Sequence, residues 1–396
     1  MKKTIRDLDI NNKKVLIRVD FNVPLVDNNI TDDKRIVAAI PTIKYALSKG
    51  AKVILFSHLG RVKQESDLEN TSLEIVYERL CELLDTKVMF CNETRGNKLE
   101  TMINQMDSKE VLLIQNTRYE DLNGKKESKN DEGLGKYWAS LGDVFINDAF
   151  GTAHRAHASN VGIASNIANS AVGFLIEKEL KYLGNALNNP SRPFVAIMSG
   201  SKVSDKITVL KRVLDIANKV IIGGGMAYTF LKAQGYNIGK SMCEDDFIPL
   251  AKEILELGKD RIVLPIDHRA TTEFSNDTTV YEIENNAISD NLMCLDIGSK
   301  TEKLFADVIS SAKTVIWNGP IGVFEFSNYS SGTFAVCTAL ANSDAITIVG
   351  GGDSASAVLQ SGLEDKFTHI STGGGASLEF LEGKVLPSID IIEDVQ

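Results

Sequence analysis

Short runs of apolar, β-branched residues alternate along the chain with longer segments that have the 3.6-residue apolar period of a helix. In the first half, strands are predicted over residues 15–20, 53–57, 87–90, 111–114 and 144–147. Helices are predicted between them over residues 36–48, 73–84, 99–106 and 133–140. This alternation predicts parallel β-sheets with helices on both faces.

The second half of the chain continues the same alternation. Its predicted strands are residues 194–198, 220–222, 262–265, 293–296, 314–317, 346–349 and 369–370, with helices such as 205–217, 226–234 and 301–312. A chain of 396 residues exceeds what one core usually serves. A predicted helix over about 174–187, followed by a turn-rich stretch over 188–193, marks the divide. We therefore predict an α/β fold of two doubly wound, parallel-sheet (Rossmann-like) lobes joined by a hinge helix.

The composition is that of an ordinary globular protein, with 43% hydrophobic and 24% charged residues. The net charge of −10 argues against a nucleic-acid binder. The 5 cysteines lie far apart, which suits neither a disulfide framework nor a zinc site. With no signal peptide or membrane-spanning stretch apparent, we expect a soluble, cytoplasmic protein.

Cationic side chains lie beside predicted strand ends and turns of the first half: Arg18, Arg35, Arg61, Arg118, Arg155 and His58. In doubly wound folds, ligands bind outside the carboxyl ends of the strands. Guanidinium groups recognise carboxylates and phosphates through paired hydrogen bonds. One such arginine would be interpreted as a surface ion pair, but several predict a site for a small, multiply charged acid.

The first strand ends in a motif that places polar side chains at this edge. Pro24 cannot continue a strand, so Asp20 and Asn22 are predicted to point into a strand-end crevice. An Asx turn is the alternative explanation for one such motif. That alternative weakens because residues 57–61, 116–118 and 147–151 end other predicted strands in a similar way.

The second half has glycine-rich turns that would let backbone N–H groups approach phosphates: residues 200–202, 223–225, 350–352 and 373–375. Residues 350–355 match the dinucleotide pattern Gly-x-Gly-x-x-Ala. The next strand, however, ends in Ser371 and Thr372, where an NAD-binding site would have an acid. Asp353 places a negative charge in the turn, which favours Mg²⁺ bridging to a nucleotide phosphate.

Other signals are weaker. Lys202 is placed to meet a phosphate, although a helix start capped by Ser204 explains the same residues. Glu325 is a candidate ribose acceptor or a solvated surface acid. Residues 235–241 resemble a Walker A loop but have one residue too few between the glycines, so we predict a plain connection. Residues 154 and 157 are histidines without an acid or cysteine at ligand spacing, and we expect Arg155 to serve an anion site.

Taken in order, these motifs resemble those of the phosphoglycerate kinases, and the resemblance runs nearly end to end. The motifs are Arg-Val-Asp-Phe-Asn-Val-Pro (18–24), Ser-His-Leu-Gly-Arg (57–61), Asn-Asp-Ala-Phe-Gly-Thr-Ala-His-Arg (147–155), Lys-Val-Ser-Asp-Lys (202–206), Trp-Asn-Gly-Pro (317–320), Gly-Val-Phe-Glu (322–325), Gly-Gly-Gly-Asp-Ser (350–354) and Ser-Thr-Gly-Gly-Gly-Ala-Ser (371–377). The resemblance implies reversible phosphoryl transfer from 1,3-bisphosphoglycerate to Mg·ADP, giving 3-phosphoglycerate and ATP in glycolysis.

The resemblance also implies a set of site residues. The glycerate substrate would be held by Asp20, Phe21, Asn22, Arg35, His58, Leu59, Gly60, Arg61, Arg118 and Arg155. The nucleotide would be held by Lys202, Lys206, Gly298, Glu325, Gly351, Gly352, Asp353 and Ser354, with Asp353 meeting Mg²⁺. Arg18 belongs to the first motif but is not usually a ligand, and a structural role is expected for it.

Both attacking groups in this reaction are already anionic, so no nucleophile–base pair is needed. Transfer requires in-line positioning and cancellation of charge on the phosphoryl group. We predict that Arg35 and Lys202 supply that charge, assisted by backbone N–H groups near Gly352 and Gly375. Hinge closure would exclude water from the acyl phosphate.

The resemblance implies two lobes and a helix between them. The N-terminal, phosphoglycerate-binding lobe would be residues 1–172 with 381–396, because the family's C-terminal segment returns to it. The interdomain helix would be residues 173–188, and the C-terminal, nucleotide-binding lobe residues 189–380. A monomer is expected. The sequence departs from the family's usual residues at Val62 and Ser299 (usually Pro), Ser199 (often Gly) and Tyr119 (usually Phe), which bears on loop stiffness. Two alternatives stay open: a nicotinamide-dependent dehydrogenase, and a non-catalytic nucleotide-binding protein of the same fold.

Overall fold

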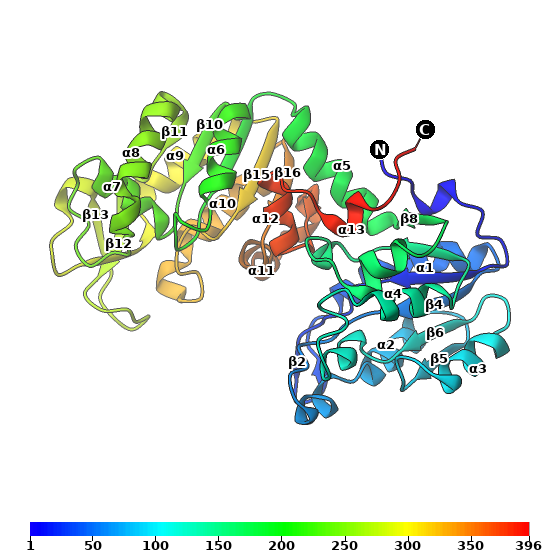
Figure 1. Cartoon of the computed structure of the whole chain (residues 1–396). Helices are drawn as coiled ribbons and strands as arrows, with labels where there is room; N and C mark the ends of the chain where they lie inside the picture. Colours follow the sequence, from blue (N-terminus) through cyan, green and yellow to red (C-terminus); the bar gives the residue numbers. More distant parts are fainter. Residues whose placement is uncertain (396) are drawn as a thin grey trace. The chain divides into compact units, whose positions relative to one another are not determined.

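The computed structural model describes residues 1–395, and the chain divides into two compact units. Unit 1 is Met1–Lys181 with Val385–Gln396, and unit 2 is Tyr182–Lys384. The chain leaves unit 1 inside helix α5 (Phe174–Asn188) and returns to it after Lys384 (Figure 1). Unit 2 is therefore an insertion in unit 1.

Unit 1 is built on a six-stranded sheet in the order β5-β6-β4-β1-β7-β8, parallel throughout. Its strands are β1 (Lys14–Arg18), β4 (Lys52–Phe56), β5 (Val88–Cys91), β6 (Val111–Ile114), β7 (Val144–Asn147) and β8 (Ser170–Val172). The central strands are runs of fully buried apolar residues, as expected where helices cover both faces.

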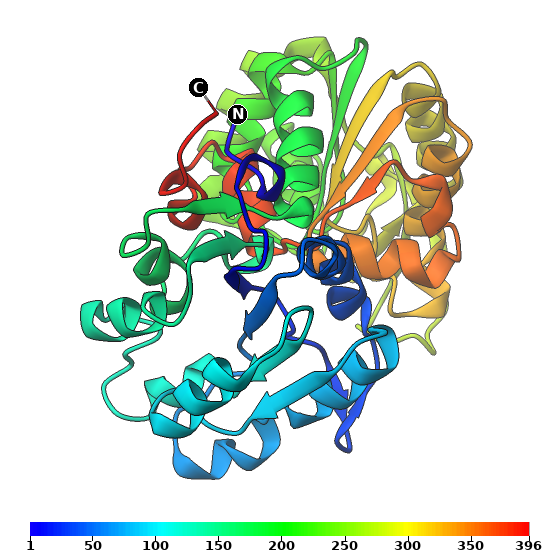
Figure 2. The ribbon, with the colours of Figure 1, turned by 90° about the vertical axis from the view of Figure 1, so that its right-hand side faces the viewer.

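The helices of unit 1 are α1 (Lys34–Ser48), α2 (Glu74–Leu83), α3 (Asn97–Gln105), α4 (Glu132–Ala139) and α13 (Pro387–Asp390). A short hairpin, β2 (Leu25–Val26) with β3 (Asn29–Ile30), follows the first strand. The two ends of the chain run side by side, because Lys2 and Asp394 form an antiparallel bridge (Figures 1 and 2).

Unit 2 has a second parallel sheet in the order β11-β10-β9-β15-β16-β17. Its strands are β9 (Phe194–Met198), β10 (Lys219–Ile222), β11 (Ile262–Val263), β15 (Thr314–Asn318), β16 (Ile346–Gly350) and β17 (His369–Ile370). The strand order reverses between β9 and β15, so the carboxyl ends of these strands are the expected ligand position.

The helices of unit 2 are α6 (Ile207–Ile216), α7 (Met226–Ala233), α8 (Ile248–Gly258), α9 (Ser299–Ser310), α10 (Ser331–Ala341), α11 (Gly352–Ser361) and α12 (Gly375–Leu381). The core between the sheet and α9, α10 and α11 is centred on Trp317, Phe305 and Val336, all essentially inaccessible to solvent. This packing fixes the strand ends from which the turns of unit 2 emerge.

One prediction about unit 2 was wrong. Residues 293–296 do not join the parallel sheet; they lie in β14 (Met293–Ile297), at the edge of an antiparallel sheet in the order β13-β12-β14. The sequence analysis missed β12 (Asp267–Thr271) and β13 (Tyr281–Glu284). The reason is composition: β12 buries Asp267 and His268, whose polar groups are satisfied by tertiary hydrogen bonds, so no apolar strand pattern is present.

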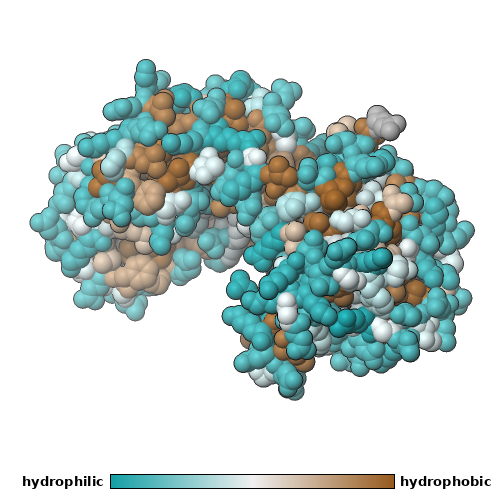
Figure 3. Space-filling view, viewed as in Figure 1, coloured by the Kyte–Doolittle hydropathy of each residue, from teal (hydrophilic) through white to brown (hydrophobic). Residues whose placement is uncertain are grey.

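Most other elements were predicted correctly, and the bounds of β6, β7, β9 and β17 agree to the residue. The β2–β3 hairpin and β8 were missed. On the face shown in Figure 3, polar residues predominate and apolar residues occur in small groups. Within residues 1–395 we find no helix with the length and apolar character needed to cross a bilayer.

Candidate functional site

In unit 1, the carboxyl ends of β1, β4 and β6 meet at one edge of the sheet. The loops that leave them are tied together by short hydrogen bonds. Phe21 N donates to Ser57 Oγ (2.9 Å) and Gly60 N donates to Asn22 Oδ1 (2.8 Å). Asn116 Nδ2 donates to the carbonyl of Leu59 (2.7 Å). The predicted strand-end residues are therefore brought together.

Arg35 enters this edge from the first turn of α1. Its Nη1 donates to Asp20 Oδ2 over 2.9 Å, and the side chain of Asp20 is only 8% exposed while that of Arg35 is 34% exposed. The carboxylate thus anchors one guanidinium nitrogen and leaves the others accessible. Asn22 is oriented by its own backbone N–H, which donates to Asp20 Oδ1 (3.2 Å).

His58 is a neutral member of this cationic edge. It is 7% exposed, and burial, followed by the charges of Arg18 and Arg118, holds its pKa well below the ordinary value of 6.5. Its Nδ1 lies 3.2 Å from Nη2 of Arg18. Arg18 itself is fully buried, which agrees with a structural role and places it behind the accessible edge.

The remaining cations of unit 1 are Arg61, Arg118 and Arg155. Arg118 lies in a 3-10 turn (Thr117–Asp121) and donates from Nη1 to Ser128 Oγ (3.1 Å). Burial lowers its pKa; the charges of Asp121 and Glu127 oppose this, and those of Arg155 and Arg61 lower the pKa further. Arg118 Nε is buried without a hydrogen-bond partner in residues 1–395. A guanidinium donor without a partner, in a cluster of cations, favours an anion.

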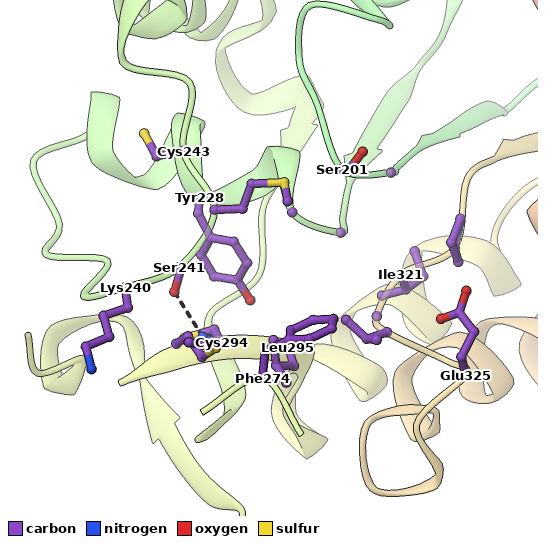
Figure 4. Close-up of a pocket in the computed structure, with 18 of the residues that line it drawn as sticks. Ser201, Tyr228, Lys240, Ser241, Cys243, Phe274, Cys294, Leu295, Ile321 and Glu325 are labelled. Carbon is purple, nitrogen blue, oxygen red and sulfur yellow. Dashed lines mark hydrogen bonds between the residues drawn. The ribbon is translucent and has the colours of Figure 1, made fainter. Parts of the chain in front are cut away.

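Unit 2 contains a cavity of about 590 Å³ at the carboxyl ends of β9, β10 and β15. Figure 4 shows Tyr228 on one wall, Phe274 and Leu295 beside it, and Ile321 and Glu325 across from them. The residues that line it are Gly200, Ser201, Gly224, Gly225, Tyr228, Lys240, Ser241, Met242, Cys243, Phe274, Met293, Cys294, Leu295, Pro320, Ile321, Gly322, Val323, Glu325 and Asp353. A mostly apolar cleft of this size with a few polar groups suits a drug-sized or nucleobase-containing ligand.

Of the nucleotide residues expected from the sequence, Glu325 and Asp353 line this cavity. The others, Lys202, Lys206, Gly298, Gly351, Gly352 and Ser354, are not among its lining residues. Lys206 Nζ donates to Asn318 Oδ1, at the end of β15, and Asp353 is one of the charges that act on it. Ser354 Oγ accepts from Gly319 N (2.6 Å). Gly298 faces Asp267, whose carboxylate a Cβ there would meet at 2.4 Å.

Two glycines in the strand-end turns of unit 2 serve packing. A Cβ on Gly319, whose φ is +96°, would lie 1.9 Å from the carbonyl oxygen of Ser199. One on Gly224, whose φ is +68°, would lie 2.6 Å from that of Gly200. Ser199 Oγ also donates to the carbonyl of Pro320 (2.5 Å). The turns after β9, β10 and β15 are thus in direct contact.

Gly352, at the start of α11, is different. A Cβ there would meet no atom of the described residues within 4 Å, and the glycine is exposed. Packing does not require a glycine at this position. The open space beside the helix N-terminus, where backbone N–H groups are unpaired, is instead suited to a ligand phosphate.

The residues present fit a magnesium ion bound together with a nucleotide. Asp353 presents an exposed carboxylate in the first turn of α11. In residues 1–395 no group of three or more His, Cys, Asp and Glu side chains is placed to hold a metal. Mg²⁺ is commonly bound by one or two carboxylates plus substrate phosphates, and this donor set matches that pattern.

Sequence reasoning missed most of the cavity wall. Tyr228 lies about one helical turn after the glycine-rich turn over 223–225. Its position next to that turn could have identified it as a site residue from the sequence. Phe274, Met293 and Leu295 come from the antiparallel sheet and its loops, and no turn or charge marks them in the sequence. Their placement depends on a sheet that the sequence did not predict.

The whole chain is similar to known phosphoglycerate kinases. The family model described as phosphoglycerate kinase matches residues 5–384. A phosphoglycerate kinase of Fusobacterium nucleatum subsp. nucleatum is 62% identical over 397 residues, and one of Macrococcus caseolyticus is 60% identical over 395, each match covering 100% of both chains. The solved structure of phosphoglycerate kinase from Coxiella burnetii has a TM-score of 0.90 at 40% identity, covering 99% of this chain and 98% of that one. The chain belongs to the phosphoglycerate kinase family.

Proposed function

We propose that the two units divide one phosphoryl transfer between them, with the glycerate substrate on unit 1 and the nucleotide on unit 2. The reaction is that of the family: reversible transfer from 1,3-bisphosphoglycerate to Mg·ADP, giving 3-phosphoglycerate and ATP in glycolysis. The dehydrogenase and the non-catalytic binding protein are thereby set aside. The observation that carries the division is the cluster of cations at the strand ends of unit 1.

The acid site that we propose consists of Asp20, Phe21, Asn22, Arg35, His58, Leu59, Gly60, Arg61, Arg118 and Arg155. A phosphate and a carboxylate on one small molecule need several donors that converge from different loops. The loops after β1 and β4, which are joined by hydrogen bonds, provide these, and Arg118, Arg61 and Arg155 add positive charge. Charge-assisted hydrogen bonds from guanidinium groups make such a site strong and specific.

The nucleotide site that we propose consists of Lys202, Lys206, Gly298, Glu325, Gly351, Gly352, Asp353 and Ser354. The base would enter the apolar cavity beside Tyr228 and Leu295, with Glu325 at its wall available to ribose hydroxyls. The phosphates would then reach the open N-terminus of α11. Asp353 would hold Mg²⁺ there, and the bound ion supplies charge neutralisation for the phosphates.

For the transfer step we propose Arg35 and Lys202 as the cations on the migrating phosphoryl group. Backbone N–H groups at Gly352 and Gly375, which begin α11 and α12, would add donors aimed at the developing charge. No side chain has to remove a proton, since the attacking oxygens are already ionised. Catalysis on this proposal is positioning and electrostatic stabilisation.

The acid-binding lobe that we propose, residues 1–172 with 381–396, corresponds to unit 1, and the nucleotide-binding lobe, 189–380, corresponds to unit 2. Residues 173–188 would act as the hinge helix. Acyl phosphates hydrolyse, so closure of the lobes would protect the reacting group from water. We propose further that the protein works as a monomer in the cytoplasm.

Small-angle X-ray scattering combined with a coupled assay tests this proposal. Turnover with 3-phosphoglycerate, ATP and Mg²⁺ establishes the active sample. The radius of gyration should decrease only when both ligands are present, and isothermal titration should give binding of 3-phosphoglycerate that Arg118→Ala weakens while MgATP binding is kept. Weakened MgATP binding with unchanged 3-phosphoglycerate binding would reverse the assignment of the two units.

A further inference from the structure

Arg18 is fully buried, and its guanidinium group makes three hydrogen bonds. Nε donates to Ser159 Oγ (2.8 Å), Nη1 donates to the carbonyl of Val19, and Nη2 contacts His58 Nδ1 (3.2 Å). An arginine at 0% exposure cannot meet a bound acid directly. Of its three hydrogen-bond partners, His58 is the one that the proposed acid site includes.

A second buried charge lies behind Arg18. Glu127 is also 0% exposed, and its carboxylate accepts from Ser159 N (2.9 Å) and from Ser159 Oγ (2.5 Å). Burial raises the pKa of Glu127, and the charge of Arg18 opposes that rise. A guanidinium group buried without a counter-ion is very unfavourable. The carboxylates of Glu127 and Asp20 both favour the charged form of Arg18, and Glu127 is connected to it through Ser159.

Only one assignment of donors and acceptors fits the hydrogen bonds among Arg18, Ser159 and His58. Arginine has donors and no acceptor, so Nδ1 of His58 must be the acceptor and must lack a proton. Ser159 gives its hydroxyl proton to Glu127 and accepts from Arg18. A neutral His58 therefore carries its proton on Nε2, and no hydrogen bond from that nitrogen to residues 1–395 is formed.

We infer that Glu127 and Ser159 are positioning residues for the acid site: through Arg18 they hold His58 as the neutral tautomer with its proton on Nε2. The inference rests on the proposed role of His58 in binding the glycerate substrate. The site thereby gains a hydrogen-bond donor of fixed orientation that carries no charge. A charged histidine at that point would add repulsion to a cluster that already holds Arg35, Arg61 and Arg118.

A purely structural explanation accounts poorly for this arrangement. Apolar residues of similar volume commonly stabilise a core as well as a buried ion pair does, or better. His157 also lies beside Glu127, with Nδ1 3.9 Å from Oε1, but burial lowers its pKa to about 3, so it does not supply a positive charge. What Arg18 provides and an apolar residue would not is a cationic donor that contacts Nδ1 of His58.

The test measures which ring nitrogen of His58 carries the proton. The protein has 5 histidines, and ¹⁵N-histidine labelling with a His58→Gln spectrum as reference identifies the His58 signals. Wild type should show Nε2 protonated and Nδ1 unprotonated. Ser159→Ala should give a mixture of the two tautomers and raise KM for 3-phosphoglycerate about tenfold, with KM for MgATP unchanged. Ser165→Ala, an exposed serine that bonds only to the carbonyl of Val161, is the matched control and should change neither quantity.

A second variant covers the case in which Ser159→Ala does not fold. Arg18→Met combined with Glu127→Leu removes both charges together and should fold, yet show the same mixed tautomer and raised KM. A wild-type spectrum with Nδ1 protonated, or unchanged tautomers in both variants, overturns the inference. If His58→Gln alone leaves KM for 3-phosphoglycerate unchanged, the proposed acid site fails, and that result does not depend on the tautomer.

Discussion

Nη1 of Arg35 and Oδ2 of Asp20 are 2.9 Å apart, with the carboxylate almost buried and the guanidinium group half-exposed. The Asp20 carboxylate therefore orients the guanidinium group of Arg35, whose exposed face is available to a ligand. Because Arg35 is proposed to act on the migrating phosphoryl group, Arg35→Ala should lower kcat by about 10²–10³. Binding of MgATP, measured by titration calorimetry, should persist.

Arg79 provides a matched control for this variant. It is an arginine of the same unit, paired with Asp33 and Glu82, and it does not belong to the proposed acid site. Arg79→Ala should turn over at the wild-type rate. Near-normal kcat in Arg35→Ala would remove Arg35 from the transfer step.

Asp353→Asn should weaken the apparent affinity for Mg²⁺ in the presence of ATP by about 10–100-fold. The amide keeps the size of the side chain but loses the charge that a hard cation prefers. Activity measured as a function of free Mg²⁺ gives the value. Because Asp353 is exposed, the melting temperature should stay the same. Asp344→Asn, another exposed acid of unit 2, is the control, and equal Mg²⁺ dependence in the two variants would contradict the assignment.

Gly319→Ala should lower the stability of the protein, whereas Gly352→Ala should weaken its interaction with the nucleotide. The first places a methyl 1.9 Å from a backbone oxygen at a φ of +96°, so the free energy of unfolding should fall by more than about 1 kcal/mol. The second places it in open space at the start of α11, so stability should be kept while KM for MgATP rises. Urea denaturation and steady-state kinetics separate the two. A Gly352→Ala enzyme with unchanged KM would show that phosphates do not approach there.

Unit 1 should lose stability in mild acid because of His157. Burial, followed by the charges of Arg18 and Arg118, lowers the pKa of His157 from 6.5 to about 3. The unfolded chain therefore binds a proton between these values that the folded chain does not bind. Stability from this group is complete above about pH 6.5 and falls as the pH drops toward 3, at most about 1.4 kcal/mol per pH unit.

The measurement uses one of the chain's two tryptophans. In a Trp317→Phe background, Trp138, which is buried in α4, reports on unit 1 alone. The free energy of unfolding at pH 5 and pH 7 should differ less in His157→Gln than in its parent. Equal differences in the two proteins would show that His157 does not contribute to the acid sensitivity.

The sequence predicted the buried parallel strands well because their whole surface is apolar. Val111–Ile114 and Phe194–Met198 are short hydrophobic runs with turn residues after them, a pattern that survives without tertiary information. The polar strand β12 left no such pattern. His268 lies in it because Tyr228 Oη and Asn285 Oδ1 satisfy its ring at 3.1 and 2.6 Å, and those partners are 40 and 17 residues away.

The same distinction applies to the site. Asp20, His58 and Arg118 follow strands directly, so their position could be predicted from the parallel topology. Leu295 and Phe274 reach the cavity through the antiparallel sheet and its loops, and Glu127 reaches Ser159, the partner of Arg18, from a loop. Leu295 lies in a strand that was predicted but assigned to the wrong sheet, and no turn or charge pattern marks Phe274 or Glu127 as part of a site. Residues that act from behind a site, or from an added sheet, are visible only in three dimensions.

The insertion of unit 2 into unit 1 has a consequence for biosynthesis. Asn147, at the end of β7, bonds through Nδ2 to both the carbonyl and the hydroxyl of Ser388, and Lys2 pairs with Asp394. The ribosome makes these partners of unit 1 only after it has made all of residues 182–384. The unit that begins first is thus completed second. During translation unit 2 can complete its hydrophobic core while unit 1 still lacks its last contacts.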